Sequence, residues 1–407
     1  MNRWNRIIPA AFLMYTIAYI DRTNFSIAMP SLQKEFGLDS GDTGIAAGIF
    51  FVGYVLFQMP GGYIAQVWSA KRFIFWSLLV WGVFATLCGF AQSYEQLLVC
   101  RFLLGVGEGG VWPATVVLLS RWFAPEERAR ANGFWVICQP VAIILSSPFS
   151  GYLIDYYNWR VMFIVQGTLP LIFAGIWWWA VEDRPEQANW AREETPLPAV
   201  PAPGAGLEGQ RWDFLWLPAV WRLVAMDLAF ACGAYGMLMW LPSTIRSLGL
   251  TNNLMIGLLS GFPYLFAIAG SIYNSRRSDR LKERRWHVAV PCLVAGVCLI
   301  LGFLAGERWP ALGLLLICLT AAGIYAAIGP MWALMTEVVP ARTAGLSLGL
   351  INGAANLGGL AGPYVVGATR DAAASFLPGF LFLSGALITA GLITLVVRKG
   401  RRVPIAV

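Results

Sequence analysis

Four ionisable residues interrupt the apolar stretches in the first third of the chain: Asp21, Arg22, Arg101 and Glu108. A charge at the centre of a bilayer costs roughly 2.5–3.5 kcal/mol, so such residues usually face a cavity where they have a function. Two cations and two acids on two spans predict a site that binds an anion and also takes up a proton. This chemistry indicates a transporter.

The spacing of these residues predicts how they meet. Arg101 and Glu108 are two helical turns apart, so they share one helix face at about 10 Å separation along the axis. Asp21 and Arg22 are adjacent and point about 100° apart, so both cannot face one partner. We expect Asp21 to pair with Arg101, leaving the planar fork of Arg22 for a substrate carboxylate. Asp21 and Glu108 then carry protons; the alternative is a purely structural ion-pair network.

The same span carries residues that shape its backbone. Pro113 predicts a bend that exposes backbone near the site. A glycine-rich run predicts close approach by a neighbouring helix, with ordinary helix packing as the alternative; its members are Gly105, Gly107, Gly109 and Gly110.

Apolar runs long enough to span a bilayer recur through the whole chain. The 407 residues are 58% hydrophobic and 13% charged, whereas soluble domains are about 25% charged. A span needs about 20 mostly apolar residues. The pattern predicts an all-α membrane protein of twelve spans, at 6–29, 44–65, 72–91, 97–120, 131–154, 161–181, 218–241, 255–275, 287–305, 310–334, 344–367 and 376–397.

Basic residues predict the orientation. Cytoplasmic loops of membrane proteins are rich in Lys and Arg, and with both termini cytoplasmic only five of the 29 basic residues fall outside, namely Lys34, Arg160, Arg246, Arg308 and Arg370. The +7 net charge is therefore a topology signal, and nucleic-acid binding is not expected. Short loops favour a bacterial inner membrane.

No metal or cofactor site is expected. The seven cysteines lie in or beside apolar runs and form no CxxC motif. With one histidine, His287, the chain offers neither a Ser-His-Asp set nor a haem-type His pair, so we do not expect an enzyme. The coupling ion is expected to be a proton.

The chain divides into related halves. A charged and then Pro-rich and Ala-rich stretch at 182–217 predicts a cytoplasmic linker between bundles at 1–181 and 218–407. GGYIAQVWSAKR resembles NSRRSDRLKERR at an offset of 213, and PEERARANG resembles PARTAG at an offset of 215. Two near-equal offsets indicate a duplication with a site between the halves.

Several motifs resemble the anion:cation symporter family of the major facilitator superfamily. They are YIDRTNFSIAMP, RFLLGVGEGGVWPA, RWFAPEERARANG, SGYLIDYYNWRVMF, WLPSTIRSLGL, FPYLFAIAG and SDRLKERRWHVAVP, and the last three are most similar to tartrate, phthalate and aldonate permeases. The resemblance implies two pseudo-symmetric six-helix bundles, alternating access and a monomer.

The loop after the second span departs from the family pattern. The family's Asp-Arg-x-Gly positions are Gln66, Val67, Trp68 and Ser69 here, so the acid that helps to lock the outward-facing state is missing. The resemblance implies that the remaining gating residues are Lys71 and Arg72, with Asp279 and Arg280 in the second half.

The resemblance to aldonate symporters also implies substrate contacts. Tyr54 and Gln139 match polar positions that contact the sugar acid in that family. Asn352 and Asn356 are four apart on one face and are candidates for binding hydroxyls. Trp332 and Tyr264 are expected in the second-half wall, with core or lipid packing as the alternative for aromatic residues.

The expected function is proton-coupled import of a small organic anion, such as a sugar acid or another mono- or dicarboxylate. An exchanger, a uniporter and a non-transporting membrane sensor remain alternatives. Two buried arginines argue against a cationic drug as cargo. The second half has no deep basic residue, which disfavours organophosphate exchange. Asp227 in the seventh span is expected to snorkel toward Arg222 or to line the inner vestibule.

Overall fold

The computed structural model describes residues 3–188, 190, 215–247, 249–306, 308–339 and 344–397, and every regular element in these ranges is helical. The predicted all-α fold is confirmed, while most of the predicted linker lies outside the described residues. The α-helices are α1 (Ile7–Phe36), α2 (Ser40–Val67), α3 (Ala70–Cys88), α4 (Tyr94–Gly109), α5 (Val111–Trp122), α6 (Pro125–Val136), α7 (Cys138–Tyr156), α8 (Trp159–Gly167), α9 (Leu169–Ala180), α10 (Pro218–Ser247), α11 (Asn253–Gly261), α12 (Pro263–Leu281), α13 (Arg285–Gly306), α14 (Pro310–Val338), α15 (Ala344–Ala373) and α16 (Leu377–Val396).

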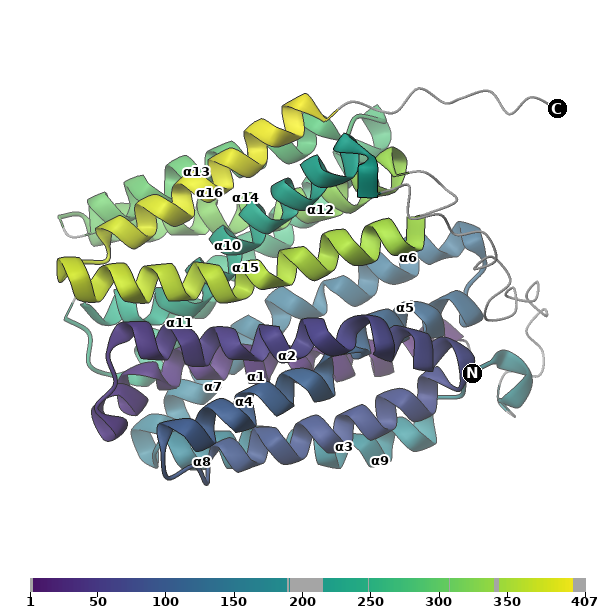
Figure 1. Cartoon of the computed structure of the whole chain (residues 1–407), viewed down its shortest axis with the longest axis horizontal. Helices are drawn as coiled ribbons and strands as arrows, with labels where there is room; N and C mark the ends of the chain where they lie inside the picture. The colour runs from purple at the N-terminus through teal and green to yellow at the C-terminus, as the bar shows by residue number, and fades with distance from the viewer. Residues whose placement is uncertain are drawn as a thin grey trace.

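The helices run side by side along one axis (Figure 1). In the described part of the chain, ten helical stretches have the length and apolar composition of membrane spans. Some of them join two helices in line, such as α4 with α5 and α11 with α12. The 30-residue helices α1 and α15 are as long but less apolar, because α1 carries buried charges and α15 combines small residues with Asn352 and Asn356. With these two, the described residues supply the twelve predicted spans.

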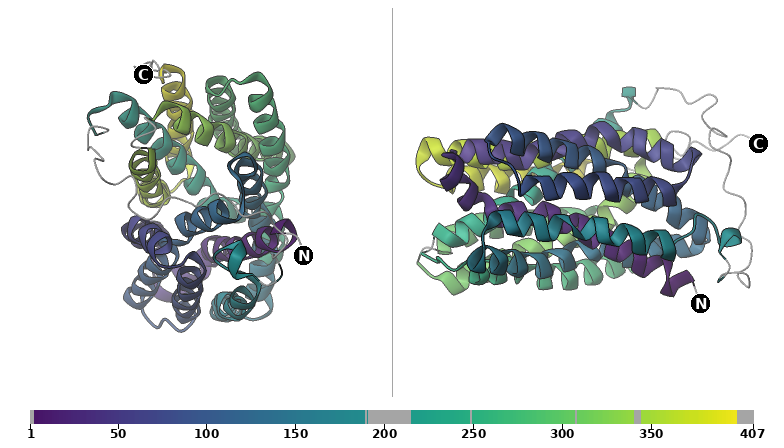
Figure 2. Two further views of the ribbon diagram at one scale, coloured as in Figure 1. Left: turned by 90° about the vertical axis from the view of Figure 1, so that its right-hand side faces the viewer. Right: turned by 90° about the horizontal axis from the view of Figure 1, so that it is seen from below.

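The helices form two lobes, α1–α9 and α10–α16; most of the first lobe lies in the lower part of Figure 1 and most of the second in the upper part, with α6 and α11 between them, and Figure 2 shows two further sides. Between the lobes, α2 packs along α15 and α7 packs along α11. α2 and α15 are the second and eleventh spans, and α7 and α11 belong to the fifth and eighth. The predicted duplication relates the second span to the eighth and the fifth to the eleventh, so the two contacts are equivalent.

The two ends of the bundle are named here by their turns. The inner end holds the start of α1 and the α2–α3 turn, and α16 also ends there (Figure 1). The outer end holds the α1–α2 and α7–α8 turns. The distribution of basic residues predicts that the inner end is cytoplasmic.

Glycines let α4 lie unusually close to its neighbours, as predicted. A Cβ on Gly105 would collide with the carbonyl oxygen of Phe50 on α2, and one on Gly107 would lie 2.9 Å from the backbone nitrogen of Trp81 on α3. The predicted interruption of this span is also present, because α4 gives way to α5 at Gly110, just before the proline.

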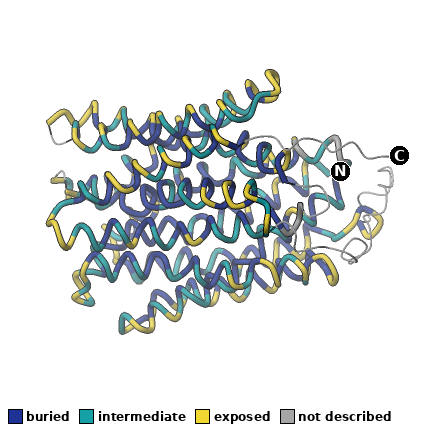
Figure 3. The backbone as a smooth tube through the Cα atoms, turned by 45° about the horizontal axis from the view of Figure 1, so that its top comes forward, coloured by how far each residue is buried: buried dark blue, intermediate teal, exposed yellow. Residues whose placement is uncertain are grey.

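The helix faces that point away from the bundle axis are apolar. Exposed residues lie on the outward faces of the helices in both lobes (Figure 3), and they include the large side chains Leu56, Leu145, Ile172 and Leu392. Soluble monomers rarely expose apolar surface on this scale, so a lipid bilayer is the environment that these faces fit.

Candidate functional site

The centre of the first lobe holds an ion pair between Arg22 on α1 and Glu108 on α4. Arg22 is 2% exposed and Glu108 is completely buried. Removing two charges from water costs several kcal/mol per ion, and mutual attraction repays this only with good geometry and further polar partners. Such a pair inside a membrane span indicates a functional site.

Four aromatic rings surround the Arg22 guanidinium. Its carbon lies 4.8 Å from the ring centroid of Tyr19 and 4.9 Å from that of Tyr54, with Phe50 at 5.3 Å and Tyr15 at 5.9 Å. Aromatic faces attract cations and keep bulk water away. The hydroxyl oxygens of Tyr15 and Tyr54 are 3.5 Å apart. The structure therefore brings the predicted site residue Tyr54 to the cation.

Arg101 is completely buried and donates to main-chain carbonyl groups on two neighbouring helices. Nη1 donates to the carbonyl oxygen of Asp21 at 3.2 Å, Nε to that of Ala46 at 3.3 Å and Nη2 to that of Ala47 at 3.4 Å. The guanidinium also lies 4.5 Å from the ring centroid of Phe25. These contacts join α4 to both α1 and α2.

The carboxylate of Asp21 faces α3. The indole nitrogen of Trp81 donates to Asp21 Oδ2 at 3.1 Å. The expected ion pair between Asp21 and Arg101 is therefore wrong, and Arg22 is paired with Glu108 instead of being free. Helical spacing predicts that Asp21 and Arg22 point in different directions, but it does not predict which neighbouring helix each side chain contacts. Asp21 contacts α3 because Trp81 offers a hydrogen-bond donor there.

Buried polar atoms at this centre lack partners among the described residues. They are Nε of Arg22, Oε2 of Glu108 and Oδ1 of Asn24. Nearly all buried polar atoms in folded proteins are hydrogen-bonded, so these atoms mark the place where water or a bound molecule would complete the site.

The second lobe contributes an amide cluster. Asn356 Nδ2 on α15 donates to Oε1 of Gln58 on α2 at 3.4 Å, and to the carbonyl oxygen of Asn352 at 2.8 Å. The predicted pair Asn352 and Asn356 thus lies together and touches the first lobe. Gln58 is absent from the predicted site residues, although it follows Tyr54 by four positions and so shares its helix face.

An aromatic stack connects the lobes on the inner side of Arg22. Trp332 on α14 stacks on Trp112 of α5, with ring centroids 6.4 Å apart and planes 25° apart. Trp112 in turn contacts Trp135 at 4.3 Å and Tyr15 at 5.3 Å. Trp332 is therefore connected, through Trp112, to Tyr15, one of the four aromatic residues around the Arg22 guanidinium.

Two further residues that were predicted to contact the substrate are buried on α12 and α7. Tyr264 on α12 is buried and packs edge-on against Tyr325 at 5.7 Å. Gln139 is 8% exposed near the start of α7. In the described part of the chain, neither forms a hydrogen bond with the ion pair.

Asp227 is buried on α10 and stands apart from this centre. Arg222, its expected partner, is exposed on the same helix. The described residues contain no ion pair between the two, so the structure does not show the expected snorkelling contact.

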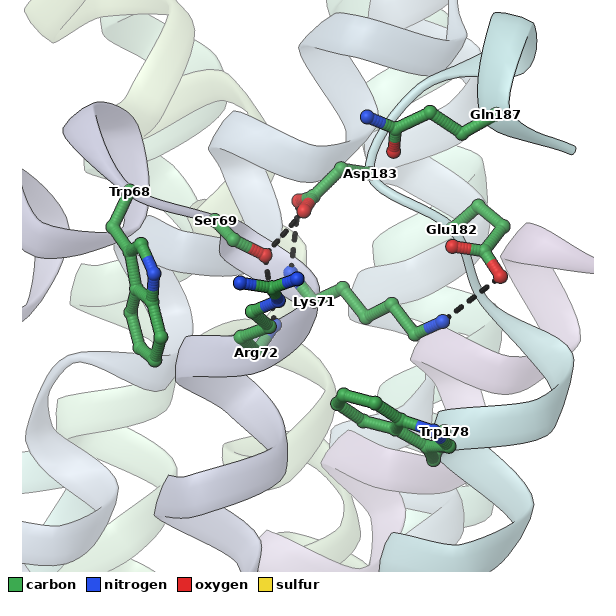
Figure 4. A pocket seen from close by; sticks show the side chains of 8 residues that line it. All are labelled: Trp68, Ser69, Lys71, Arg72, Trp178, Glu182, Asp183 and Gln187. Carbon is green, nitrogen blue, oxygen red and sulfur yellow. Dashed lines mark hydrogen bonds and ion pairs between the residues drawn. The ribbon is translucent and has the colours of Figure 1, made fainter.

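A second polar cluster lies at the inner end, where Asp183 follows α9. Its carboxylate accepts hydrogen bonds from the Ser69 hydroxyl and from the Lys71 backbone nitrogen at 3.0 Å (Figure 4). It also accepts one from Arg121 Nη1 at 3.2 Å. Arg121 Nη2 also donates to the carbonyl oxygen of Gln66 at 2.8 Å. Asp183, which follows the sixth span, thus supplies a carboxylate to the α2–α3 turn, where Gln66 stands at the position of the family's acid.

The predicted gating residues of the first half line a cavity of about 400 Å³ beside Asp183 (Figure 4). Lys71 Nζ pairs with Glu182 at 2.9 Å and lies 4.8 Å from the ring centroid of Trp178. The Arg72 side chain is exposed, while its backbone nitrogen donates to Ser69 Oγ at 3.0 Å.

The equivalent loop of the second half keeps its own acid. Asp279 pairs with Arg284 Nη1 at 2.6 Å, and Arg284 Nε lies 3.3 Å from Glu337 of α14. Arg280 is exposed beside them. The two halves therefore hold the same turn with acids from different places in the sequence.

Comparison with known proteins agrees with this architecture. Residues 11–363 match the family described as the Major Facilitator Superfamily. The "Putative tartrate transporter" of Agrobacterium vitis is 32% identical over 97% of this chain and 90% of its own length. The "Hexuronate transporter" of Bacillus subtilis (strain 168) is 26% identical over 95% of this chain and 92% of its own length.

A solved structure shares the fold. A bacterial homologue of the human lysosomal transporter Spinster, crystallised in an inward-facing and unoccupied conformation, superposes with a TM-score of 0.74 at 18% identity, covering 96% of this chain and 94% of that one. The predicted family resemblance is confirmed. The chain is a multi-pass membrane transport protein, not an enzyme, and it belongs to the major facilitator superfamily.

Proposed function

We propose that the protein imports a small organic anion together with protons, by alternating access, across a bacterial inner membrane and as a monomer. The observation that carries the proposal is the buried ion pair of Arg22 and Glu108, which still has an unused donor and an unused acceptor. The names of the tartrate and hexuronate relatives support an organic acid as cargo.

Arg22 is the proposed anchor for a carboxylate. A guanidinium stays charged and presents a planar fork that matches two carboxylate oxygens. The ring of Tyr54 lies beside it, and one helical turn further along α2 the amide of Gln58 meets that of Asn356 from the other lobe, next to Asn352. One cation with hydroxyl and amide groups suits a hydroxylated monocarboxylate or a small dicarboxylate.

Glu108 is the proposed proton carrier. When Glu108 is ionised, its carboxylate pairs with the Arg22 guanidinium, the group that the cargo would bind. Protonation removes its charge, weakens the ion pair and releases the fork of Arg22, so the proton and the anion favour each other's binding. Asp21 remains a second candidate carrier, although its carboxylate accepts a hydrogen bond from Trp81 on α3 instead of pairing with an arginine.

Arg101 is proposed to position the site instead of touching cargo. Three of its donors are directed at main-chain carbonyl groups, including that of Asp21 in the residue before Arg22. This arrangement fixes α1 against α2 and α4, and thereby fixes the direction from which Arg22 projects.

Transport by purified protein in proteoliposomes tests the proposal. Wild-type protein is expected to accumulate radiolabelled tartrate or glucuronate when the interior is alkaline, and Glu108→Gln is expected to lose accumulation while keeping counterflow exchange. Glu35→Gln is the matched control, because Glu35 is an acid of α1 that pairs with Arg160 at the outer end.

Each other outcome contradicts part of the proposal. Accumulation by Glu108→Gln on a pH gradient would remove Glu108 from proton coupling. Wild-type counterflow without any response to the gradient would identify an exchanger or uniporter. Binding of the acids without counterflow would identify a sensor.

A further inference from the structure

A carboxylate at the end of α7 crosses from the first lobe to the second at the outer end. Asp155 Oδ1 accepts from the backbone nitrogen of Asn253 at 3.1 Å and from its side-chain amide at 2.6 Å. Asp155 Oδ2 accepts from the backbone nitrogen of Leu254 at 2.7 Å. Asn253 and Leu254 begin α11, so the acid satisfies amides of a helix first turn.

A second carboxylate crosses in the opposite direction. Asp371 Oδ2, near the end of α15, accepts from the backbone nitrogen of Gly41 in the first turn of α2 at 2.7 Å. Its neighbour Arg370 donates through Nη1 to the hydroxyl of Ser40. The second lobe thus holds the start of α2 as the first lobe holds the start of α11.

The two contacts are copies of one another. Asp371 follows Asp155 by 216 positions and Leu254 follows Gly41 by 213, in agreement with the offsets of 213 and 215 between the duplicated halves. One ancestral contact, in which the fifth span of one half binds the second span of the other, therefore occurs twice across the lobe interface.

Each contact lies at the end of two tightly packed helices, α2 with α15 and α7 with α11. The first backbone amides of a helix lack intrahelical partners and carry partial positive charge, so an approaching carboxylate binds them well. Next to the contact of Asp371, a Cβ on Gly44 would lie 2.8 Å from the carbonyl oxygen of Pro363. Next to the contact of Asp155, a Cβ on Gly257 would collide with the carbonyl oxygen of Ser147.

We propose that Asp155 and Asp371 are paired gating residues that hold the outer end closed, and that both contacts must break before the outer end opens. The pair sets the balance between inward-facing and outward-facing protein. The inference depends on the alternating access proposed above, but not on the identity of the cargo or the coupling ion.

Distance measurements between the lobes test this role. Spin labels at Gln92 and Arg308, exposed residues on equivalent outer turns of the two lobes, report opening by double electron–electron resonance. Cys100, the one cysteine of intermediate exposure, is first replaced by serine, since the other six are buried. The protein is measured in nanodiscs without cargo and without a pH gradient, so a failed proton-coupling proposal does not affect the result.

Asp155→Asn and Asp371→Asn are each expected to raise the ratio of long-distance to short-distance protein by about two- to fivefold, and the double variant by the product of the two. Glu95→Gln is the matched control, because this acid lies in the first turn of α4 at the same end and its hydrogen bonds stay within its own turn. It is expected to leave the ratio unchanged.

Two results would overturn the proposal. One is an unchanged distance distribution in both single variants while size-exclusion profiles match wild type. The other is an equal shift in Glu95→Gln, which would assign the effect to surface charge in general. If the double variant does not fold, the two single variants decide between the same outcomes.

Discussion

The guanidinium of Arg22 and the carboxylate of Glu108 neutralise each other at a point that almost no solvent reaches. Because each retains an unpartnered polar atom, the pair is incomplete as a structural element. A carboxylate ligand and a proton are the two additions that would satisfy it, which makes the following variants informative.

Replacing Arg22 by lysine tests the need for a planar fork. Arg22→Lys keeps the charge but loses bidentate geometry and stacking on Tyr19 and Tyr54. We expect tartrate or glucuronate to bind about tenfold more weakly, the equivalent of one charge-assisted hydrogen bond. Calorimetric titration of the purified protein measures this, and unchanged affinity for both acids would place the anchor elsewhere.

Glu108→Gln should remove the pH dependence of cargo binding. In the proposed mechanism, lower pH favours the protonated Glu108 carboxyl and so releases Arg22, and the affinity of the wild type for cargo should rise as pH falls. Glutamine imitates the neutral acid at every pH, so the variant should bind equally well at two well-separated pH values. Thermal-shift titrations with glucuronate at both values make the comparison; a variant that keeps the wild-type slope contradicts it.

Arg101→Gln should destabilise the protein. The substitution leaves carbonyl groups of α1 and α2 without their charged donor, at an expected cost of about 2–3 kcal/mol. The midpoint of thermal unfolding in detergent reports the loss. Arg222→Gln serves as control, because Arg222 is exposed, and equal effects of the two changes would argue against the positioning role.

Gly105→Ala should disturb the packing of α4 on α2. The added methyl group meets the Phe50 carbonyl oxygen directly, and overpacking of this kind typically costs about 1–3 kcal/mol. We expect a lower unfolding temperature and slower counterflow. Gly175→Ala on α9, whose Cβ would meet nothing within 4 Å, should behave as wild type.

Asp183→Asn should loosen the inner end of the first lobe. The change weakens contacts with Ser69, the Lys71 amide and Arg121, at about 1–3 kcal/mol. Limited proteolysis of the α2–α3 turn should become faster, whereas Glu186→Gln, an exposed acid three residues later, should not change the rate. Equal protection in both variants would show that Asp183 does not replace the missing loop acid.

The fold follows from the sequence because bilayer thickness fixes the length of each apolar run. Even the interruption between α4 and α5 was predictable, since glycines and a proline stand together there. α1 and α15 are the least apolar of the predicted spans. Their polar residues include Arg22, which pairs with Glu108 inside the first lobe, and Asn356, which contacts Gln58 of the other lobe.

The pairing within the site was not predictable in the same way. Sequence spacing gives the direction of Asp21 relative to Arg22, but the indole donor of Trp81 comes from a helix whose rotation no local pattern reveals. Asp183 was missed for a related reason, since it lies beyond the sixth span. The loss of an acid at Gln66, combined with acids at 182 and 183, was the available signal.

The three carbonyl groups held by Arg101 have a consequence for how cargo choice can change. They join α4 to α1 and α2, so under the proposed alternating access the ionic centre would keep its shape while the opposite lobe moves past it. If Asn352 and Asn356 bind the cargo as proposed, substitutions around them would alter which hydroxyl pattern is accepted without rebuilding the proposed anchor at Arg22. Diversity of nutrients among related carriers would then accumulate on the α15 side.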